Sequence, residues 1–288
     1  MKAAPFDYLE AYSADEAVHL MHESGADAAI LAGGQTLMPL LALRMATPSV
    51  LVDINPAKDM AGITRGDHGI RVGARTRQAA AKRDPVIAQH LPVLTEALTH
   101  VGHHQTRSRG TIGGSTALGE PAAELPATAV ALGALVELRS KRGTRLVPAR
   151  DFYIGPYMTV RADDEVLLAV HYPEWAEGTK VIFDEVARRA GDFALVGLVM
   201  LLDVRERRIH RAGIAWFGMG PTPVAATAAE AALTGCTISD IDVAELSQIA
   251  LTEVEPGDDL HATSEYRRKV ASRIFKAKLA SSLEKVAL

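Results

Sequence analysis

Two pairs of adjacent glycines are the residues whose type and spacing most suggest chemistry. Gly33-Gly34 follows the apolar run 28–32, and Gly113-Gly114 lies about eighty residues later in the stretch GTIGGS at 110–115. Glycine permits positive φ and lets another group approach the backbone closely. Small, hydroxyl-bearing residues accompany both pairs. The pattern predicts two loops that grip one ligand.

The first glycine pair lies inside an expected strand–turn–helix–strand unit. Gln35 and Thr36 should open a helix that stops before Thr47-Pro48, because the residue before proline avoids the helical region. Residues 51–54 then form the next strand. The first N–H groups of such a helix have no partner within it, so the turn suits a phosphate or another anion. Taken alone, the pair is equally compatible with a plain tight turn.

Several classes of site are excluded by what the sequence lacks. It contains neither G-x-G-x-x-G after a strand nor G-x-x-x-x-G-K-[ST], which argues against a Rossmann unit and a P-loop. Cys236 is the only cysteine, so it cannot support a disulfide within the chain, an iron–sulfur cluster or a cysteine zinc site. Neither His19 and His22 nor His103-His104 has a third ligand at metal spacing. We expect no metal site and no catalytic residue in this chain.

The amino-acid composition is typical of a globular protein. Hydrophobic residues make up 48 % and charged residues 23 %, and the net charge of -4 gives no electrostatic reason to expect nucleic acid as a partner. The N-terminus lacks the apolar core of a signal peptide, and no run approaches the length of a membrane span. We therefore expect a cytoplasmic protein.

The order of apolar runs and turn signals predicts an α+β protein of three blocks, 1–57, 58–177 and 178–288. In the first block, Ser13 and Glu16 form a capping box for a helix that ends near Gly25. The other expected elements are strands at 70–73, 134–140, 165–173, 198–204 and 209–217, and helices flanking Pro85 and Pro92 and at 126–132, 224–233 and 264–286.

Charged clusters outside the glycine loops have simpler interpretations. Asp163-Asp164 is expected to form a turn before a strand rather than a catalytic acid pair. Arg267-Arg268-Lys269 lies early in the last helix, where a surface for a partner is one interpretation.

The two glycine loops also resemble a known family. AGGQTLMPL at 32–40 and RGTIGGSTA at 109–117 look like the two flavin-binding loops of the medium, FAD-carrying subunits of molybdenum hydroxylases, which include carbon monoxide dehydrogenase and the middle part of xanthine dehydrogenase. Supporting motifs are FDYLEAYSADEAVHLM at 6–21, RDFYIGPYMT at 150–159, ARRAGDFALVG at 187–197 and EYRRKVASRI at 265–274. The resemblance covers essentially the whole chain.

The resemblance implies a fold and a set of domains. The expected α+β fold has a two-part FAD-binding region of the vanillyl-alcohol-oxidase/PCMH-like type at 1–57 and 58–177. A C-terminal domain at 178–288 should contain a small antiparallel sheet and a helical bundle.

The resemblance also implies which residues hold the cofactor. The first loop should wrap the FAD diphosphate with main-chain N–H groups, and the second should close over its other side and the ribityl chain. Glu124 takes the place of an acidic residue that binds the adenosine portion. The implied cofactor-binding residues are Ala29, Ile30, Leu31, Ala32, Gly33, Gly34, Gln35, Thr36, Leu37, Val101, Gly102, Arg109, Gly110, Thr111, Gly114, Ser115, Ala117, Leu118, Ala123, Glu124, Val166, Leu167 and Phe193.

Phe193 has two interpretations. The resemblance places it against the isoalloxazine ring, near Val166 and Leu167, whereas the apolar residues 194–196 that follow it leave a core phenylalanine as the alternative. 

Four positions differ from the pattern usual in the family. Ser115 stands where relatives more often have asparagine, Thr106 where many have isoleucine, and Glu124 where aspartate is usual. Glu185 replaces a lysine often found near the flavin ring.

By resemblance, the chain takes electrons from the 2Fe–2S centres of a small partner subunit and passes them from FAD to an external acceptor. The molybdenum cofactor is expected on a large partner subunit, in a dimer of heterotrimers. Two alternatives stay open at this point. One is a free-standing flavin oxidase or reductase of the related fold, and the other is a non-enzymatic module that binds another nucleotide.

Overall fold

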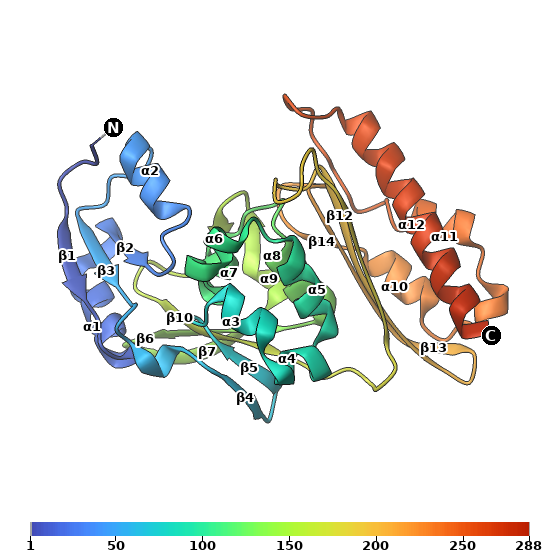
Figure 1. The fold of residues 1–288 in the computed structure, drawn as a ribbon, viewed down its shortest axis with the longest axis horizontal. Coiled ribbons are helices and arrows are strands. Elements are labelled where there is room, and N and C mark those ends of the chain that lie inside the picture. Colours follow the sequence, from blue (N-terminus) through green and yellow to red (C-terminus); the bar gives the residue numbers. More distant parts are fainter. Residues whose placement is uncertain (1, 288) are drawn as a thin grey trace.

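The computed structural model describes residues 2–287, whose strands form four sheets. Figure 1 shows the N-terminal elements, a central part whose helices gather on one side of a sheet, and a C-terminal part whose long helix lies at the far end. The α+β fold expected from the sequence is confirmed. The predicted boundaries at residues 57 and 177 stay predictions.

The first part is a small parallel sheet in the order β1-β3-β2. Its elements are β1 (Asp7–Glu10), α1 (Ala14–Ser24), a 3₁₀ turn (Gly25–Asp27), β2 (Ala28–Leu31), α2 (Leu37–Leu43) and β3 (Val50–Asp53). The expected capping of α1 is confirmed, since Ser13 Oγ accepts the Glu16 N–H at 3.1 Å. Parallel neighbours need crossover connections, which α1 and α2 provide.

The helix after the first glycine pair is shorter than the sequence predicts. The sequence predicts that Thr47-Pro48 ends this helix, but α2 already ends at Leu43. Arg44 takes a left-handed conformation with φ of 56° and its N–H bonds to the carbonyl of Leu41 at 3.1 Å. This left-handed cap ends the helix before the proline is reached.

The second part is an antiparallel sheet in the order β4-β5-β10-β6-β7, with a hairpin, β8-β9, beside it. Its strands are β4 (Ile63–Gly66), β5 (Gly69–Gly73), β6 (Leu135–Ser140), β7 (Gly143–Pro148), β8 (Tyr153–Gly155), β9 (Met158–Thr159) and β10 (Val166–Tyr172). Its helices are a 3₁₀ turn (Lys58–Met60), α3 (Gln78–Arg83), α4 (Pro85–His90), α5 (Pro92–His100), α6 (His104–Arg109), α7 (Ile112–Leu118), α8 (Glu124–Leu132) and α9 (Ala149–Phe152).

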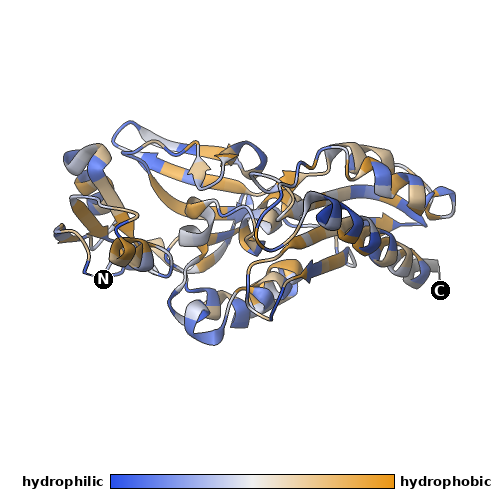
Figure 2. Ribbon diagram, turned by 90° about the horizontal axis from the view of Figure 1, so that it is seen from above, coloured by the Kyte–Doolittle hydropathy of each residue, from blue (hydrophilic) through white to orange (hydrophobic). Residues whose placement is uncertain are grey.

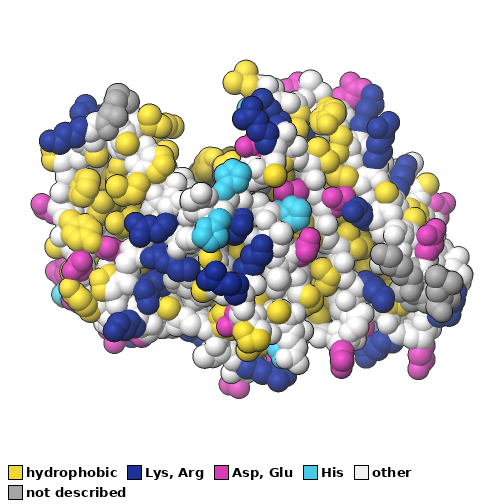
Figure 3. Space-filling view, viewed as in Figure 1, with side chains coloured by type: hydrophobic (Ala, Val, Ile, Leu, Met, Phe, Trp, Pro, Cys, Tyr) yellow, Lys and Arg dark blue, Asp and Glu magenta, His cyan; other side chains and the backbone are white. Residues whose placement is uncertain are grey.

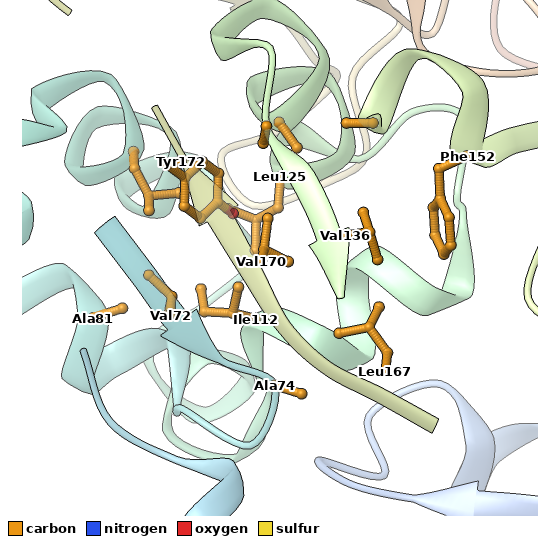
Figure 4. Close-up of a cluster of buried hydrophobic side chains, with 14 of the residues drawn as sticks. Val72, Ala74, Ala81, Ile112, Leu125, Val136, Phe152, Leu167, Val170 and Tyr172 are labelled. Atoms are coloured by element: carbon orange, nitrogen blue, oxygen red, sulfur yellow. The ribbon is translucent and has the colours of Figure 1, made fainter. Parts of the chain in front are cut away.

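The second glycine stretch is a helix rather than the loop that the sequence predicts. Thr111 caps α7, with its Oγ1 accepting the Gly114 N–H at 3.0 Å. A Cβ on Gly113 would lie 2.4 Å from the Cβ of Ala74, so glycine lets α7 rest directly on the end of β5. Figure 4 shows the core that results, in which Ile112 of α7 and Leu125 of α8 face Val170 and Tyr172 of β10. Tertiary packing overrides the low helix propensity of glycine here.

The third part is an antiparallel sheet covered on both faces. It consists of β11 (Lys180–Val186), β12 (Val196–Arg205), β13 (Arg208–Phe217) and β14 (Val224–Ala225), followed by α10 (Thr227–Leu233), a 3₁₀ turn (Ile238–Asp240), α11 (Val243–Ile249) and α12 (Ser264–Ala287). Successive residues of a strand point to opposite faces. Leu198 and Trp216 therefore join the core beneath α10–α12, while Val199 and Phe217 join the core shared with α8.

This double burial explains why most of β12 and the second half of β13, residues 212–217, are nearly continuous apolar runs. The apolar colour in Figure 2 is concentrated on the interior strands, whereas the helix leading to the C-terminus shows mostly hydrophilic residues. Among the described residues, no helix is both long and apolar enough to cross a membrane.

Of the basic cluster at the start of α12, Arg267 is buried, whereas Arg268 and Lys269 are exposed, so a partner surface formed by these two stays a prediction. Arg267 is only 6 % exposed. Its guanidinium donates to the carbonyls of Leu195 and Gly218, the latter at 2.9 Å, and to Asp259 Oδ2 at 2.6 Å. It thereby fastens α12 to the start of β12 and the end of β13.

We expect Arg267→Met to lower the free energy of unfolding by about 2–4 kcal/mol, because each buried carbonyl left without a donor costs about 1–3 kcal/mol. Lys269→Met is the matched control. Lys269 is on the same helix, and its side chain is 70 % exposed and pairs with Glu265 at 2.6 Å. Urea denaturation of both variants checks this. Equal stabilities would show that the buried guanidinium contributes nothing.

Candidate functional site

A cavity of about 540 Å³ lies where the three parts meet. Its walls come from β2 and the turn after it, from the segment that spans α5 to α8, from the start of β10, and from the loop 191–193 before β12. Figure 3 shows the surface hollowed between the N-terminal part and the rest of the molecule. No single part encloses this cavity.

Two turns touch each other in the cavity wall. The first turn is residues 33–36 after β2, and the second is residues 109–114, which connect α6 to α7 and include its first turn. A Cβ on Gly33 would lie 2.6 Å from the Arg109 carbonyl oxygen and 2.8 Å from Gly110 Cα. Gly34 has a φ of 70°, which glycine adopts without strain. From the sequence alone, the small size of Gly33 is expected to serve the approach of a ligand. The structure shows that it makes room for the other turn.

The two turns differ in the N–H groups that they leave free. Among the described residues, no acceptor is found for the N–H groups of Gly34, Gln35 and Thr36. The N–H groups of the second turn instead have protein acceptors: Ile112 N–H donates to the Thr76 carbonyl at 3.0 Å, and Gly113 N–H donates to the Ala74 carbonyl at 2.8 Å. The first turn therefore offers hydrogen-bond donors to an anion, and the second mainly shapes the opposite wall.

Nearly all residues that the resemblance implied for the cofactor line this cavity. The exceptions are Leu31, whose side chain packs beside Gly34, and Arg109, whose carbonyl contacts Gly33. That these residues contact a cofactor stays a prediction. Lining residues absent from the implied set are Ala28, Leu40, Ile54, Ala74, Gln78, Thr106, Gly113, Glu120, Arg161, Gly191 and Asp192.

The missed residues differ in the signal they carry. Gly113 lies inside the motif RGTIGGSTA and Gly191-Asp192 inside ARRAGDFALVG, so these three residues carry a local sequence signal. Gln78 and Arg161 have no local signal, because only the fold brings them to the cavity. Gln78 is buried, and its Oε1 has no hydrogen-bond partner among the described residues. A buried polar atom without a partner is costly, so this amide is suited to a ligand.

Glu124 is a buried carboxyl at the first position of α8, with 5 % exposure. Burial raises its pKa to about 8, and the nearby carboxylates of Glu185 and Glu120 add to the rise. At neutral pH the group is therefore mostly protonated, and it can both donate and accept a hydrogen bond. Glu120, also in the wall, accepts a hydrogen bond from the Tyr157 hydroxyl.

Glu185, which replaces a lysine usual in the family, does not line the cavity. It lies on β11 and contacts His100 Nδ1 through Oε1 at 3.1 Å. The His100 ring packs against Phe183, with 4.8 Å between ring centroids. Burial raises the pKa of Glu185.

Phe193 is at the mouth of the cavity with 60 % of its surface exposed. The interpretation as a core phenylalanine is wrong, since Ala194 and Leu195 are the residues that turn inward. A Cβ on Gly191 would lie 2.6 Å from His103 Cε1, so glycine allows this loop to lie against the start of α6.

No group of three or more histidine, cysteine, aspartate or glutamate side chains that could hold a metal occurs among the described residues. Asp163-Asp164 lies in a turn before β10, as expected, and Asp164 pairs with Arg142. The polar groups of the cavity wall thus include main-chain N–H groups, the amide of Gln78, the protonated carboxyl of Glu124 and the guanidinium of Arg161, beside an apolar surface.

We expect Glu124→Gln to change the pH dependence of stability of the ligand-free chain. Because the folded pKa of about 8 exceeds the unfolded value of 4.5, the unfolded state ionises first as the pH rises. The native chain should lose up to about 1.4 kcal/mol of stability per pH unit between these two values, and the glutamine variant should not. Denaturation at pH 5, 6, 7 and 8 measures this. Glu177→Gln, at an exposed position, is the control, and parallel curves for all three proteins would contradict the raised pKa.

Comparison with known proteins gives the same picture over the whole chain. Residues 4–175 match the family described as the FAD binding domain in molybdopterin dehydrogenase, and residues 181–281 match the CO dehydrogenase flavoprotein C-terminal domain. The chain is 37 % identical over 286 residues to the 6-hydroxypseudooxynicotine dehydrogenase complex subunit alpha of Paenarthrobacter nicotinovorans, covering 99 % of this chain and 97 % of that one. It is 33 % identical to the caffeine dehydrogenase subunit beta of Pseudomonas sp. strain CBB1, with the same coverage of both chains.

A solved structure extends the likeness to three dimensions. A chain of carbon monoxide dehydrogenase from Hydrogenophaga pseudoflava superposes with a TM-score of 0.93 at 34 % identity, covering 97 % of this chain and 98 % of that one. The family and the flavoprotein fold expected from the two glycine loops are confirmed. This chain belongs to the FAD-binding medium subunits of the carbon monoxide dehydrogenase and xanthine dehydrogenase family of molybdenum hydroxylases.

Proposed function

We propose that FAD lies in this cavity with its diphosphate at the two glycine turns, and that the chain carries electrons between an iron–sulfur partner and an external acceptor. The observation that supports this best is the contact of both turns in one cavity, with the free N–H groups of Gly34, Gln35 and Thr36 at the first turn. A diphosphate carries about two negative charges, which converging main-chain N–H groups can satisfy without buried cations.

The rest of the cavity fits the other parts of the cofactor. Val166 and Leu167 form an apolar wall, and Phe193 stands at the mouth, which suits the flat isoalloxazine ring. The neutral carboxyl of Glu124 supplies a donor and an acceptor for the hydroxyls of the adenosine portion. FAD, when bound, supplies the electron chemistry, while the protein places it and controls access.

The iron–sulfur and molybdenum centres belong to other chains in this proposal. With Cys236 as its only cysteine, the chain has no ligand set for a 2Fe–2S centre. The partners are a small 2Fe–2S subunit and a large molybdenum-cofactor subunit, assembled as a dimer of heterotrimers. Exposed apolar side chains near the cavity support a docking surface: Met38, Leu43 and Met45 are all exposed on or just after α2. The cytoplasmic location stays a prediction.

Co-expression with the candidate small and large subunits tests this assignment. We expect a complex with two copies of each of three chains, containing molybdenum, iron and one FAD per copy of this chain. The flavin should be reduced when the organic substrate is added. A stable monomer that oxidises an organic substrate alone would instead support a free-standing flavin enzyme.

We expect Phe193→Ala to retain FAD but to change the rate at which reduced flavin reacts with oxygen or an artificial acceptor, because the ring stands at the cavity mouth. The loss of stability should be well below the about 3–5 kcal/mol typical of a buried phenylalanine. Phe275→Ala, in the core beneath α12, is the control that should show the full loss. Unchanged reoxidation in Phe193→Ala would show that the ring does not control access to the flavin.

A further inference from the structure

Asn55 and Arg77 connect the two glycine turns through hydrogen bonds, although neither residue lines the cavity. We propose that this pair, called here the strap, sets the separation of the two turns and thereby the affinity for FAD. Both are positioning residues, since they act on the ligand only through main chain. The inference rests on the proposal that the turns hold the FAD diphosphate.

Asn55 holds the first turn. It follows β3, and its Nδ2 donates to the Ala32 carbonyl at 2.8 Å, immediately before Gly33. The side chain is oriented by Asp53, whose Oδ1 accepts the Asn55 N–H at 2.8 Å and lies 2.6 Å from Nδ2. Asp53 Oδ2 in turn accepts the Tyr8 hydroxyl at 2.5 Å. That hydrogen bond raises the pKa of Tyr8 to about 12, so the hydroxyl stays a donor across the physiological range.

Arg77 holds the second turn by both backbone and side chain. The residues on either side of it pair with that turn: Gln78 N–H donates to the Gly110 carbonyl at 2.9 Å, and Ile112 N–H donates to the Thr76 carbonyl at 3.0 Å. Its guanidinium donates to the Arg109 carbonyl through one terminal nitrogen. The other terminal nitrogen donates to Asn55 Oδ1 at 2.5 Å, which completes the strap.

The strap and the contact between Gly33 and Gly110 limit the separation of the two turns from opposite sides. The backbones of Gly33 and Gly110 already touch, so the turns cannot move closer together. The strap prevents them from moving apart. The Arg109 carbonyl takes part in both, because it contacts Gly33 and accepts from Arg77. The distance between the free N–H groups of the first turn and the opposite wall is therefore fixed before a ligand arrives, which lowers the cost of binding.

Charge at the same junction also favours an anion. The guanidinium of Arg77 lies near those of Arg75 and Arg109; burial, together with these two neighbours, lowers its pKa. Arg75 donates to the Asn55 carbonyl at 2.7 Å. In Figure 3, basic side chains gather over the region of α3 and α6, beside the hollow. These three cations attract a diphosphate bound at the turns by long-range electrostatics, without contacting it.

The test compares Asn55→Ala, Arg77→Met and the double variant in the full-length chain, by titrating the apoprotein with FAD. Each single change should weaken FAD binding at least about tenfold, which corresponds to about 1.4 kcal/mol. Either single change already breaks the strap. The double variant should therefore have about the same FAD affinity as the single variant with the larger loss, rather than the sum of both losses. Arg77→Lys, which keeps the charge and can reach one acceptor, should recover part of the affinity.

Arg65→Met is the matched control. Arg65 also makes two hydrogen bonds to one distant side chain, Glu174, at 2.6 and 2.8 Å, but this pair has no contact with the turns. It should leave FAD affinity unchanged. Thermal unfolding of each apoprotein separates positioning from folding. A loss of affinity matched by a comparable loss of apoprotein stability, with no recovery in Arg77→Lys, would assign Arg77 to folding and overturn the proposal.

Gly114→Val separates failure of the strap from failure of the proposed FAD position. A Cβ on Gly114 would lie 2.7 Å from Thr111 Oγ1, so the larger side chain disrupts the second turn itself. If Gly114→Val loses FAD while Asn55→Ala and Arg77→Met bind it like the native chain, the strap proposal is wrong and the position of the diphosphate stands. If Gly114→Val also binds FAD fully, the diphosphate does not lie at these turns.

Discussion

The contact between the two glycine turns is the constraint on which the rest of this structure depends. Gly33 belongs to a parallel sheet of residues 7–53, and Gly110 belongs to the helical segment above a separate antiparallel sheet. A cavity that offers main-chain N–H groups beside a second turn requires both turns at one place, with no side chain between them. Several features hold the two turns in this position: the Asn55 hydrogen bond to the Ala32 carbonyl, the Thr111 cap of α7, and the short helices α2 and α7 that follow the turns.

The C-terminal part closes the same cavity from a third side. Its sheet is buried on both faces, which fixes β12 firmly between α8 and α12. The loop 191–193 enters the cavity wall just before that strand, and Arg267 holds the connecting residue Leu195. A rigid strand thus positions an exposed aromatic side chain at the cavity mouth. Loops that carry function are commonly held by such rigid elements.

The electrostatics of the cavity fit a ligand with a charged middle and an apolar end. Its polar groups include N–H donors, the amide of Gln78 and the neutral carboxyl of Glu124. Arg161 also lines it, with its guanidinium bonded to the carbonyls of Ala162 and Glu165, while Arg75 and Arg77 stay outside. Burying a full charge in the wall would cost several kcal/mol without a partner. The family of FAD-binding medium subunits, to which the chain belongs, uses a cofactor with this distribution of charge.

The sequence by itself determined the family, the α+β class, the glycine pairs, the capping of α1 and the central hairpin, because these depend on local periodicity, on turn chemistry or on motifs in their order along the chain. It was wrong about the length of α2 and about the second glycine stretch, where packing on Ala74 makes a helix of a glycine-rich segment. Only the tertiary structure decided that Phe193 is exposed and Arg267 buried, and that Gln78 and the Asn55–Arg77 pair meet the turns. These outcomes depend on contacts between segments far apart in the chain, which leave no periodic signal in the residues around them.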